Sequence, residues 1–452
     1  MIAEACAAPV HVANRFSRLT GLLAAVPTRL PARLPTLLLT LSCTLVLSLP
    51  AAQAQVLTPS LRVQHWWQSN SERIASDTLG TEVRKAGIGW VDEYSGNGVG
   101  ASILLRSRIL ARAIPDIAQG NSIASHHWSQ LGLVSDLDAL AAADNWKGRL
   151  LPAVDRLIRP SGHVVAVPLG IHRINTLFYN RALFARLGIS PPQSWDELDR
   201  VAAKLQRAGI VPLAQSSEPW QIAILFEILV IADGGVPLHR RLFGQADERA
   251  YADPRLAVVL QHLRHLKTWM RQPVPELGWM EVTGQLVDGS AAMLVAGDWV
   301  KGELAAAGAD VDQRFGCVGA PSTASVHVYD IDTLAMLRSR QAPRQAQEKV
   351  AQIAMRPELQ ERYNRIKGSV SVLKSANLAA MDSCARASWT LFASPDTELV
   401  PSMAIGMADE EELRDALIGE LHRFFTDDAI TVEDTQRRMA AASRAFTRTR
   451  LP

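Results

Sequence analysis

Two adjacent tryptophans are placed where they could hold a flat, ring-shaped molecule. The chain has eleven Trp against five Tyr, and Trp66 and Trp67 close a predicted strand that opens at Leu61. Because successive side chains of a strand point to opposite faces, one indole can enter the core while the other lines a cleft at the carboxyl end of the strand. An indole packs against the apolar face of a pyranose and leaves its N–H free for a hydroxyl. The pair indicates sugar recognition, with core packing as the alternative.

Sugar recognition also needs fixed donors and acceptors for the hydroxyl groups. Glu72 and Lys367 are suitable, because charge-assisted hydrogen bonds are stronger than neutral ones. Taken alone, each of these two residues is better explained as a solvated surface charge.

Catalytic motifs do not emerge from the sequence. There is no G-x-S-x-G, H-E-x-x-H, phosphate-binding loop or dinucleotide-binding glycine motif. The neighbouring His126 and His127 are better explained by a helix end or surface than by a metal site. A glycosidase needs two carboxylates at a defined separation, and the sequence does not indicate such a pair. We therefore expect a binding protein without a cofactor or metal.

The first 54 residues have the composition of an export signal. An apolar run at 34–49 is too short for a comfortable membrane span and is followed by an Ala-x-Ala site ending at Ala54. The alternative is an uncleaved membrane anchor. Removing this leader takes away four Arg and one Glu, so the formal net charge changes from +2 to −1. A near-neutral chain has no basic surface for nucleic acid. The arginines of the leader are Arg15, Arg18, Arg29 and Arg33.

Two of the four cysteines remain after cleavage, Cys317 and Cys384. Two cysteines in an exported chain indicate one disulfide, with two unpaired buried thiols as the alternative.

The elements that would position these residues alternate between strand and helix. Helices are predicted over 72–85, 102–113, 194–209, 410–425 and 432–445, and strands over 61–66, 115–119, 164–168 and 175–180. Ser194 and Glu197 form a predicted capping box. This alternation predicts an α/β fold with mainly parallel sheets. Nearly 400 residues without a flexible spacer favour two lobes joined by several crossings, a hinge design that can close around a ligand.

Several short motifs together carry a resemblance that spans the chain from Val63 to about Ala445. The chain resembles the family-1 extracellular solute-binding proteins, most closely the periplasmic glucose/mannose-binding proteins of ABC importers. The motifs are H-W-W at 65–67, V-A-V-P-L-G-I-H-R-I-N at 165–175, E-P-W-Q at 218–221, A-G-D-W-V-K-G-E at 296–303, K-G-S at 367–369, D-S-C at 382–384 and P-S-M-A at 401–404.

The resemblance implies a two-lobe periplasmic-binding-protein fold that closes on a sugar without changing it chemically. The lobes would be 55–168 plus 333–373 and 169–332 plus 374–452, with crossings near 169–175, 328–332 and 374–378. Cys317 and Cys384 would then lie in the C-terminal lobe, consistent with a disulfide there. The sugar contacts implied by position are Trp66, Trp67, Glu72, Trp279 and Lys367.

Three further positions of the implied site depart from the glucose-binding pattern. Asn121 stands in place of a Lys, Asp330 in place of an Asn, and Ile405 in place of a His. Because these changes alter both charge and hydrogen bonding, sugar binding is expected but glucose specificity is not; a disaccharide or modified sugar is one alternative ligand.

The function implied is that of a monomeric periplasmic protein that delivers a sugar to ABC permease subunits in the inner membrane. The alternatives are a sugar sensor that feeds a chemoreceptor or sensor kinase, and a secreted carbohydrate-active enzyme.

Overall fold

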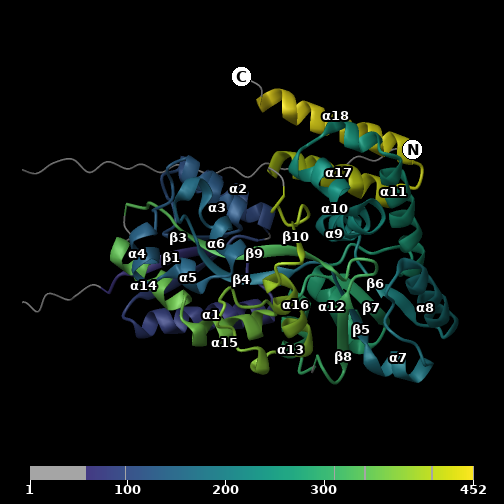
Figure 1. Cartoon of the computed structure of the whole chain (residues 1–452), viewed down its shortest axis with the longest axis horizontal. Helices are drawn as coiled ribbons and strands as arrows, with labels where there is room; N and C mark the ends of the chain where they lie inside the picture. The colour runs from purple at the N-terminus through teal and green to yellow at the C-terminus, as the bar shows by residue number, and fades with distance from the viewer. Residues whose placement is uncertain (1–57, 97, 310, 341–342, 409–410, 451–452) are drawn as a thin grey trace, which may run out of the picture. The chain divides into compact units, whose positions relative to one another are not determined.

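The computed structural model describes residues 58–450 except 97, 310, 341–342 and 409–410. These residues belong to one compact unit, Leu57–Pro452, which is built around two sheets and their helices (Figure 1). The predicted signal peptide, with its cleavage site after Ala54, lies outside the described residues.

The first sheet has six strands in the order β10-β9-β3-β1-β2, with β4 also paired to β9. Pairs β1–β2, β1–β3 and β9–β10 are parallel, whereas β3–β9 and β4–β9 are antiparallel. The strands are β1 (Ser60–His65), β2 (Gly89–Tyr94), β3 (Ile117–Gly120), β4 (Val167–Arg173), β9 (Val326–Met336) and β10 (Glu398–Pro401).

The second sheet has the order β6-β7-β5-β8, in which only β6–β7 is parallel. Its strands are β5 (Thr176–Asn180), β6 (Val211–Ala214), β7 (Ala291–Ala296) and β8 (Phe315–Gly319). Four of the eight described strand pairs are therefore antiparallel, so the prediction of mainly parallel sheets is wrong. In the first sheet the reason is that the chain passes between the sheets and returns along β9, which is antiparallel to β3 and β4 and parallel to β10.

The helices divide between two large apolar cores, one for each sheet. Figure 1 shows α1, α14 and α15 beside the first sheet and α7, α8 and α12 beside the second. The helices are α1 (Asn70–Lys85), α2 (Gly98–Leu110), α3 (Ser122–Gln130), α4 (Asp138–Ala143), α5 (Trp146–Arg149), α6 (Pro152–Leu157), α7 (Arg181–Leu187), α8 (Trp195–Arg207), α9 (Pro219–Leu229), α10 (Gly235–His239), α11 (Pro254–Leu266), α12 (Trp279–Asp288), α13 (Trp299–Ala306), α14 (Arg344–Ala354), α15 (Pro357–Lys367), α16 (Ser383–Ala393), α17 (Glu411–Thr426) and α18 (Val432–Arg450).

One stretch, Pro219–Gly244, is long and apolar enough to cross a membrane by length and composition. The stretch begins with α9, whose apolar side chains belong to the core of the second sheet. In its most apolar segment of 18 residues, 78% is buried inside the protein. Packing within the protein accounts for its composition.

Most predicted elements are present, with shifts where the sequence signal was ambiguous. The strand expected over 164–168 is β4, which runs on to Arg173, and β2 was not predicted, because its sequence GWVDEY mixes apolar and charged residues. Ser194 does cap α8, accepting from the backbone N–H of Glu197 at 3.2 Å. The Glu197 carboxylate, however, accepts from Gln193 rather than from Ser194, so the predicted capping box is incomplete.

The passages between the sheets run through β4–β5 and β8–β9. Asn175 holds both together: its side-chain N–H donates to the Thr323 and Val326 carbonyls, and its oxygen accepts from the Val328 N–H. Strand β4 stays in the first sheet through Arg173, past the boundary predicted at 168. The exact limits predicted for the two lobes stay a prediction.

Candidate ligand-binding site

The two tryptophans at the end of β1 have different surroundings. Trp67 is 0% exposed and packs into the first core, with its ring 4.9 Å from that of His65 and 6.1 Å from that of Tyr363. Trp66 is partly exposed, and its backbone N–H donates to Gln119 Oε1 at 3.1 Å. Both residues come directly after β1, which ends at His65; one indole lies inside and the other at the surface, and the buried one is Trp67.

Glu72 joins the start of α1 to a buried lysine. Its Oε2 accepts from the backbone N–H groups of Gln68 and Ser69, which completes a capping box with Ser69. Its Oε1 accepts from Lys367 Nζ at 3.1 Å. Helix capping therefore fixes one carboxylate oxygen and directs the other toward Lys367, at the end of α15.

Lys367 is 4% exposed and also lies 3.9 Å from Asp332 Oδ2 on β9. Burial acts to lower the pKa of Lys367, but the carboxylates of Glu72 and Asp332 outweigh it and raise that pKa above its usual value. Gln119 on β3 donates to Asp332 Oδ1 at 3.1 Å. Lys367 is therefore held as a buried cation among carboxylates from α1 and β9.

His172 on β4 is a second buried cation beside the first. Its Nδ1 lies 2.5 Å from Asp298 Oδ1, and its Nε2 lies 3.5 Å from Asp332 Oδ2. Burial and the charge of Lys367 oppose protonation, yet Asp298 and Asp332 raise the pKa of His172 to about 9. Asp298 Oδ2 in turn accepts from the backbone N–H of Arg173 at 3.0 Å.

Asp330 and Asp332 lie two residues apart on β9 and carry opposite perturbations. Burial and the charge of Asp332 raise the pKa of Asp330 to about 7. Burial also acts to raise the pKa of Asp332, but Lys367 and His172 hold it below its ordinary value. One carboxylate is therefore firmly ionised, and its neighbour ionises only near neutrality.

Five buried polar atoms of this region have no hydrogen-bond partner among the described residues, although two of them, His172 Nε2 and Asp332 Oδ2, form the 3.5 Å ion-pair contact given above. Tyr363 packs on Trp67, and the charges of Asp332 and Glu72 act on its hydroxyl, so these atoms belong to one region. Buried polar atoms in proteins are normally paired, and a group of unpaired ones calls for an explanation such as a ligand. The atoms are Trp67 Nε1, Tyr363 Oη, His172 Nε2, Asp330 Oδ1 and Asp332 Oδ2.

Aromatic rings continue from this polar cluster along α12 and α13. Trp299, the first residue of α13, lies 5.6 Å from the His172 ring and 6.0 Å from Trp220 (ring centroids). Trp299, Trp220 and Trp279 line one small pocket together with Gln215 and other side chains of α9, α12 and β7. Trp279, which the resemblance implied, is therefore one member of a wall of three indoles.

Asn121 and Ile405 are brought together, but the polar atoms of Asn121 are committed to the fold. Its Oδ1 caps α3 by accepting from the Ala124 N–H, and its Nδ2 donates to the carbonyls of Ile405 and Gly406 at 3.1 and 2.9 Å. Asn121 and Ile405, which both depart from the glucose-binding pattern, are therefore in contact with each other within the fold.

Helix α13 bridges the two cores. Its residues Trp299 and Leu304 belong to the second core, whereas Glu303 Oε1 accepts from the Ser71 N–H at the start of α1 at 2.7 Å. A Cβ on Gly302 would lie 2.6 Å from the carbonyl oxygen of Ile366, so only glycine allows α13 this close to α15. Hydrogen bonding and close packing thus join α13 to the helices that carry Glu72 and Lys367.

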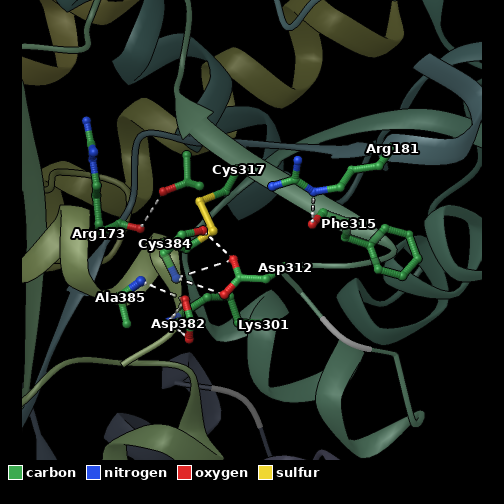
Figure 2. The surroundings of a disulfide bond; sticks show 11 residues. Arg173, Arg181, Lys301, Asp312, Phe315, Cys317, Asp382, Cys384 and Ala385 are labelled. Carbon is green, nitrogen blue, oxygen red and sulfur yellow. Dashed lines mark hydrogen bonds and ion pairs between the residues drawn. A yellow bond between two sulfur atoms is a disulfide. The ribbon is translucent and has the colours of Figure 1, made fainter. Parts of the chain in front are cut away.

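The predicted disulfide between Cys317 and Cys384 is present, with 5.9 Å between the Cα atoms. It joins β8 to α16 beside α13 (Figure 2). Asp382, at the start of α16, accepts from the Ala385 N–H at 2.7 Å and from Lys301 Nζ of α13 at 3.1 Å (Figure 2). The disulfide therefore anchors the segment that holds α13.

A separate groove of about 520 Å³ lies along α8 and α11. It contains two His–Asp pairs, His262 with Asp233 at 2.9 Å and His265 with Asp199 at 3.0 Å. Among the described residues, no group of three or more His, Cys, Asp or Glu is arranged to hold a metal ion.

Sequence reasoning missed four residues of the polar cluster: Gln119, His172, Asp298 and Asp332. His172 and Asp298 both fall within quoted motifs, and Asp332 follows Asp330 by two residues on one strand, so a period-two pattern on β9 was the available signal. Gln119 carried no signal of its own.

Comparisons with known proteins agree with this architecture. Residues 81–350 match the family model described as bacterial extracellular solute-binding protein. A probable sugar-binding periplasmic protein of Brucella suis biovar 1 (strain 1330) is 27% identical over 401 residues, which cover 88% of this chain and 94% of the relative. A probable sugar-binding periplasmic protein of Rhizobium meliloti (strain 1021) is 26% identical over 399 residues, covering 87% and 96%.

Among solved structures, the bacterial solute receptor AcbH, described as preferring β-D-galactopyranose, has a TM-score of 0.74 at 17% identity. The match covers 87% of this chain and 99% of that protein, and it shows the two-lobe fold. The family model alone matches more than half of the sequence, and the chain belongs to the bacterial extracellular solute-binding proteins.

Proposed function

We propose that this protein captures a sugar in the periplasm and delivers it to the permease subunits of an ABC importer. The observation that carries the proposal is the group of buried, unpartnered polar atoms beside an aromatic wall. Sugars present hydroxyl groups around an apolar ring face, so they pair with both features at once. The names of the relatives from Brucella and Rhizobium support the same class of ligand.

Within this proposal the residues divide by role. Trp66 and Trp279, both partly exposed, offer ring faces, while Trp67 contributes its buried N–H. Lys367 and Asp330 form hydrogen bonds with the hydroxyl groups of the sugar, together with Asp332 and His172. Glu72 positions Lys367, and Asn121 with Ile405 shapes the edge of the site rather than contacting the sugar through polar atoms.

Closure around the sugar follows from the two sheets and their crossings. The lobes would approach along the contact that α13 makes with α1, so that the ligand is enclosed without being altered chemically. The protein would act as an exported monomer, with its signal peptide removed after about Ala54 and no nucleic acid among its partners.

Thermal shift and titration calorimetry with a panel of hexoses, pentoses, amino sugars and disaccharides test the proposal. A ligand that binds only the folded state stabilises it by about 2.7 kcal/mol at one hundred times its dissociation constant. We expect a saturable, one-site response from at least one sugar. Product analysis after prolonged incubation should recover that sugar unchanged, and hydrolysis or transfer would contradict the binding role.

A further inference from the structure

Carboxylates outnumber cations in the buried cluster. His172 and Lys367 are each bonded to one carboxylate, His172 to Asp298 at 2.5 Å and Lys367 to Glu72 at 3.1 Å. These two pairings leave the carboxylates of Asp330 and Asp332 on β9 without a cation of their own. The closest approaches to Asp332 are the 3.9 Å and 3.5 Å contacts of the same two cations.

Arg173 adds a positive charge that acts on Asp298, while its side-chain hydrogen bonds go to groups other than the β9 carboxylates. Its Nε donates to Asn175 Oδ1, and its guanidinium is directed at the carbonyls of Ala324 and Val326. The guanidinium therefore bonds to the segment that passes between the sheets and not to the carboxylates of β9.

Both carboxylates of β9 are buried, Asp330 being 5% and Asp332 4% exposed. Within the described residues Asp330 Oδ1 and Asp332 Oδ2 accept no hydrogen bond, and Asp332 Oδ2 has only the two longer ion-pair contacts given above. Isolated buried carboxylates are costly, and a protein keeps them where a metal, a proton or a cationic group pairs with them. Asp330 pairs in register with His172 across β4 and β9, so its oxygen faces the polar cluster.

We propose that the ligand is a sugar that carries a positively charged amino group, bound by the carboxylates of Asp330 and Asp332. The inference rests on the proposed sugar-binding function and names its substrate class. An ammonium group supplies the missing positive charge and up to three N–H donors, enough for both unpartnered oxygens. An anionic sugar would add to the surplus negative charge, and a neutral sugar would leave it uncompensated.

Titration calorimetry on the purified protein tests the proposal with glucosamine, galactosamine and mannosamine, each beside its parent hexose and its N-acetyl form. One of the three amines should bind at least about tenfold more tightly than its neutral counterparts, because a charge-assisted hydrogen bond contributes more than a neutral one. Equal affinities for amine and parent hexose would overturn the proposal.

Asp330→Asn keeps the shape of the side chain and removes its charge. The substitution should weaken binding of the amine about tenfold or more while changing affinity for the parent hexose less than about threefold. Asp396→Asn, at an exposed position outside the cluster, is the matched control and should change neither. Loss of both ligands in Asp330→Asn, with the fold retained by circular dichroism, would also contradict the proposal.

A pH series gives a readout that does not depend on a variant. The charged groups that act on Asp330 are Asp332 from β9, His172 from β4 and Lys367 from α15; Asp298 and Glu72 are the partners of His172 and Lys367. Because a proton competes with the amine for Asp330, affinity for the amine should fall as pH decreases below about 7, approaching tenfold per unit. Affinity for the N-acetyl form should stay flat, and a flat profile for both would refute the role of Asp330. If no carbohydrate binds at all, the proposed function fails and this inference fails with it.

Discussion

Replacing Lys367 with methionine removes the cation that pairs with the carboxylate of Glu72. Nζ lies 3.1 Å from Glu72 and 3.9 Å from Asp332, and the side chain is buried, so both carboxylates lose a neighbour that water cannot replace. Breaking a buried ion pair from one side costs about 3–5 kcal/mol. Glu72 keeps its bonds to the N–H groups of Gln68 and Ser69, which places the expected loss near the lower end of that range, about 3 kcal/mol.

Urea unfolding followed by circular dichroism measures this loss. Lys374→Met is the matched control: Lys374 is exposed, and its Nζ donates to the Gly148 carbonyl at 3.1 Å, so its removal should change stability by less than about 0.5 kcal/mol. Lys367→Met should also abolish sugar binding in calorimetry under conditions where it remains folded. A Lys367→Met protein as stable as the control would refute the cluster as a tightly coupled, buried site.

Three further outcomes are expected. Trp67→Ala should cost about 3–5 kcal/mol of unfolding free energy, because the indole is fully buried, whereas Trp66→Ala should leave the midpoint nearly unchanged and weaken sugar binding; the reverse pattern would exchange their roles. Replacing both Cys317 and Cys384 with serine should cost about 4 kcal/mol on the chain-entropy model for a separation of 67 residues, and an unchanged melting temperature would show that the bridge adds no stability. Glu303→Gln weakens the hydrogen bond between α13 and the first turn of α1, so calorimetry should show a several-fold larger dissociation constant for the sugar. An unchanged dissociation constant would mean that this bond has no part in closure around the ligand.

Local patterns in the sequence predicted much of the fold. Helix α1 was predicted from Glu72 and begins two residues earlier at Asn70, where Ser69 and Glu72 cap it through short-range bonds. The Cys317–Cys384 disulfide follows from two cysteines in an exported chain. The direction of the strands could not be predicted from such local patterns. Whether β9 runs parallel or antiparallel to its neighbours depends on how the chain passes between two sheets, which no local window contains.

The polar cluster was predicted only in part. Trp66, Trp67, Glu72 and Lys367 were predicted as ligand contacts by type and motif, and that role stays a prediction; the structure places Glu72, Lys367 and the Trp67 N–H in the cluster region. The partners of these residues were not predicted, because Gln119 and Asp332 are 213 residues apart in the chain and meet only through the pairing of β3 with β9. The alternation rule correctly separates the two indoles, but which of them is buried depends on the helices packed against β1, and the structure buries Trp67.

The most direct test of the account is a crystal structure of the protein with its tightest-binding sugar. The account predicts the sugar at the polar cluster, with hydroxyl or amino groups within hydrogen-bond distance of Asp332 Oδ2 and Trp67 Nε1 and a ring face against Trp66 or Trp279. A sugar bound instead in the groove beside His262 and His265, with the cluster unchanged, would contradict it.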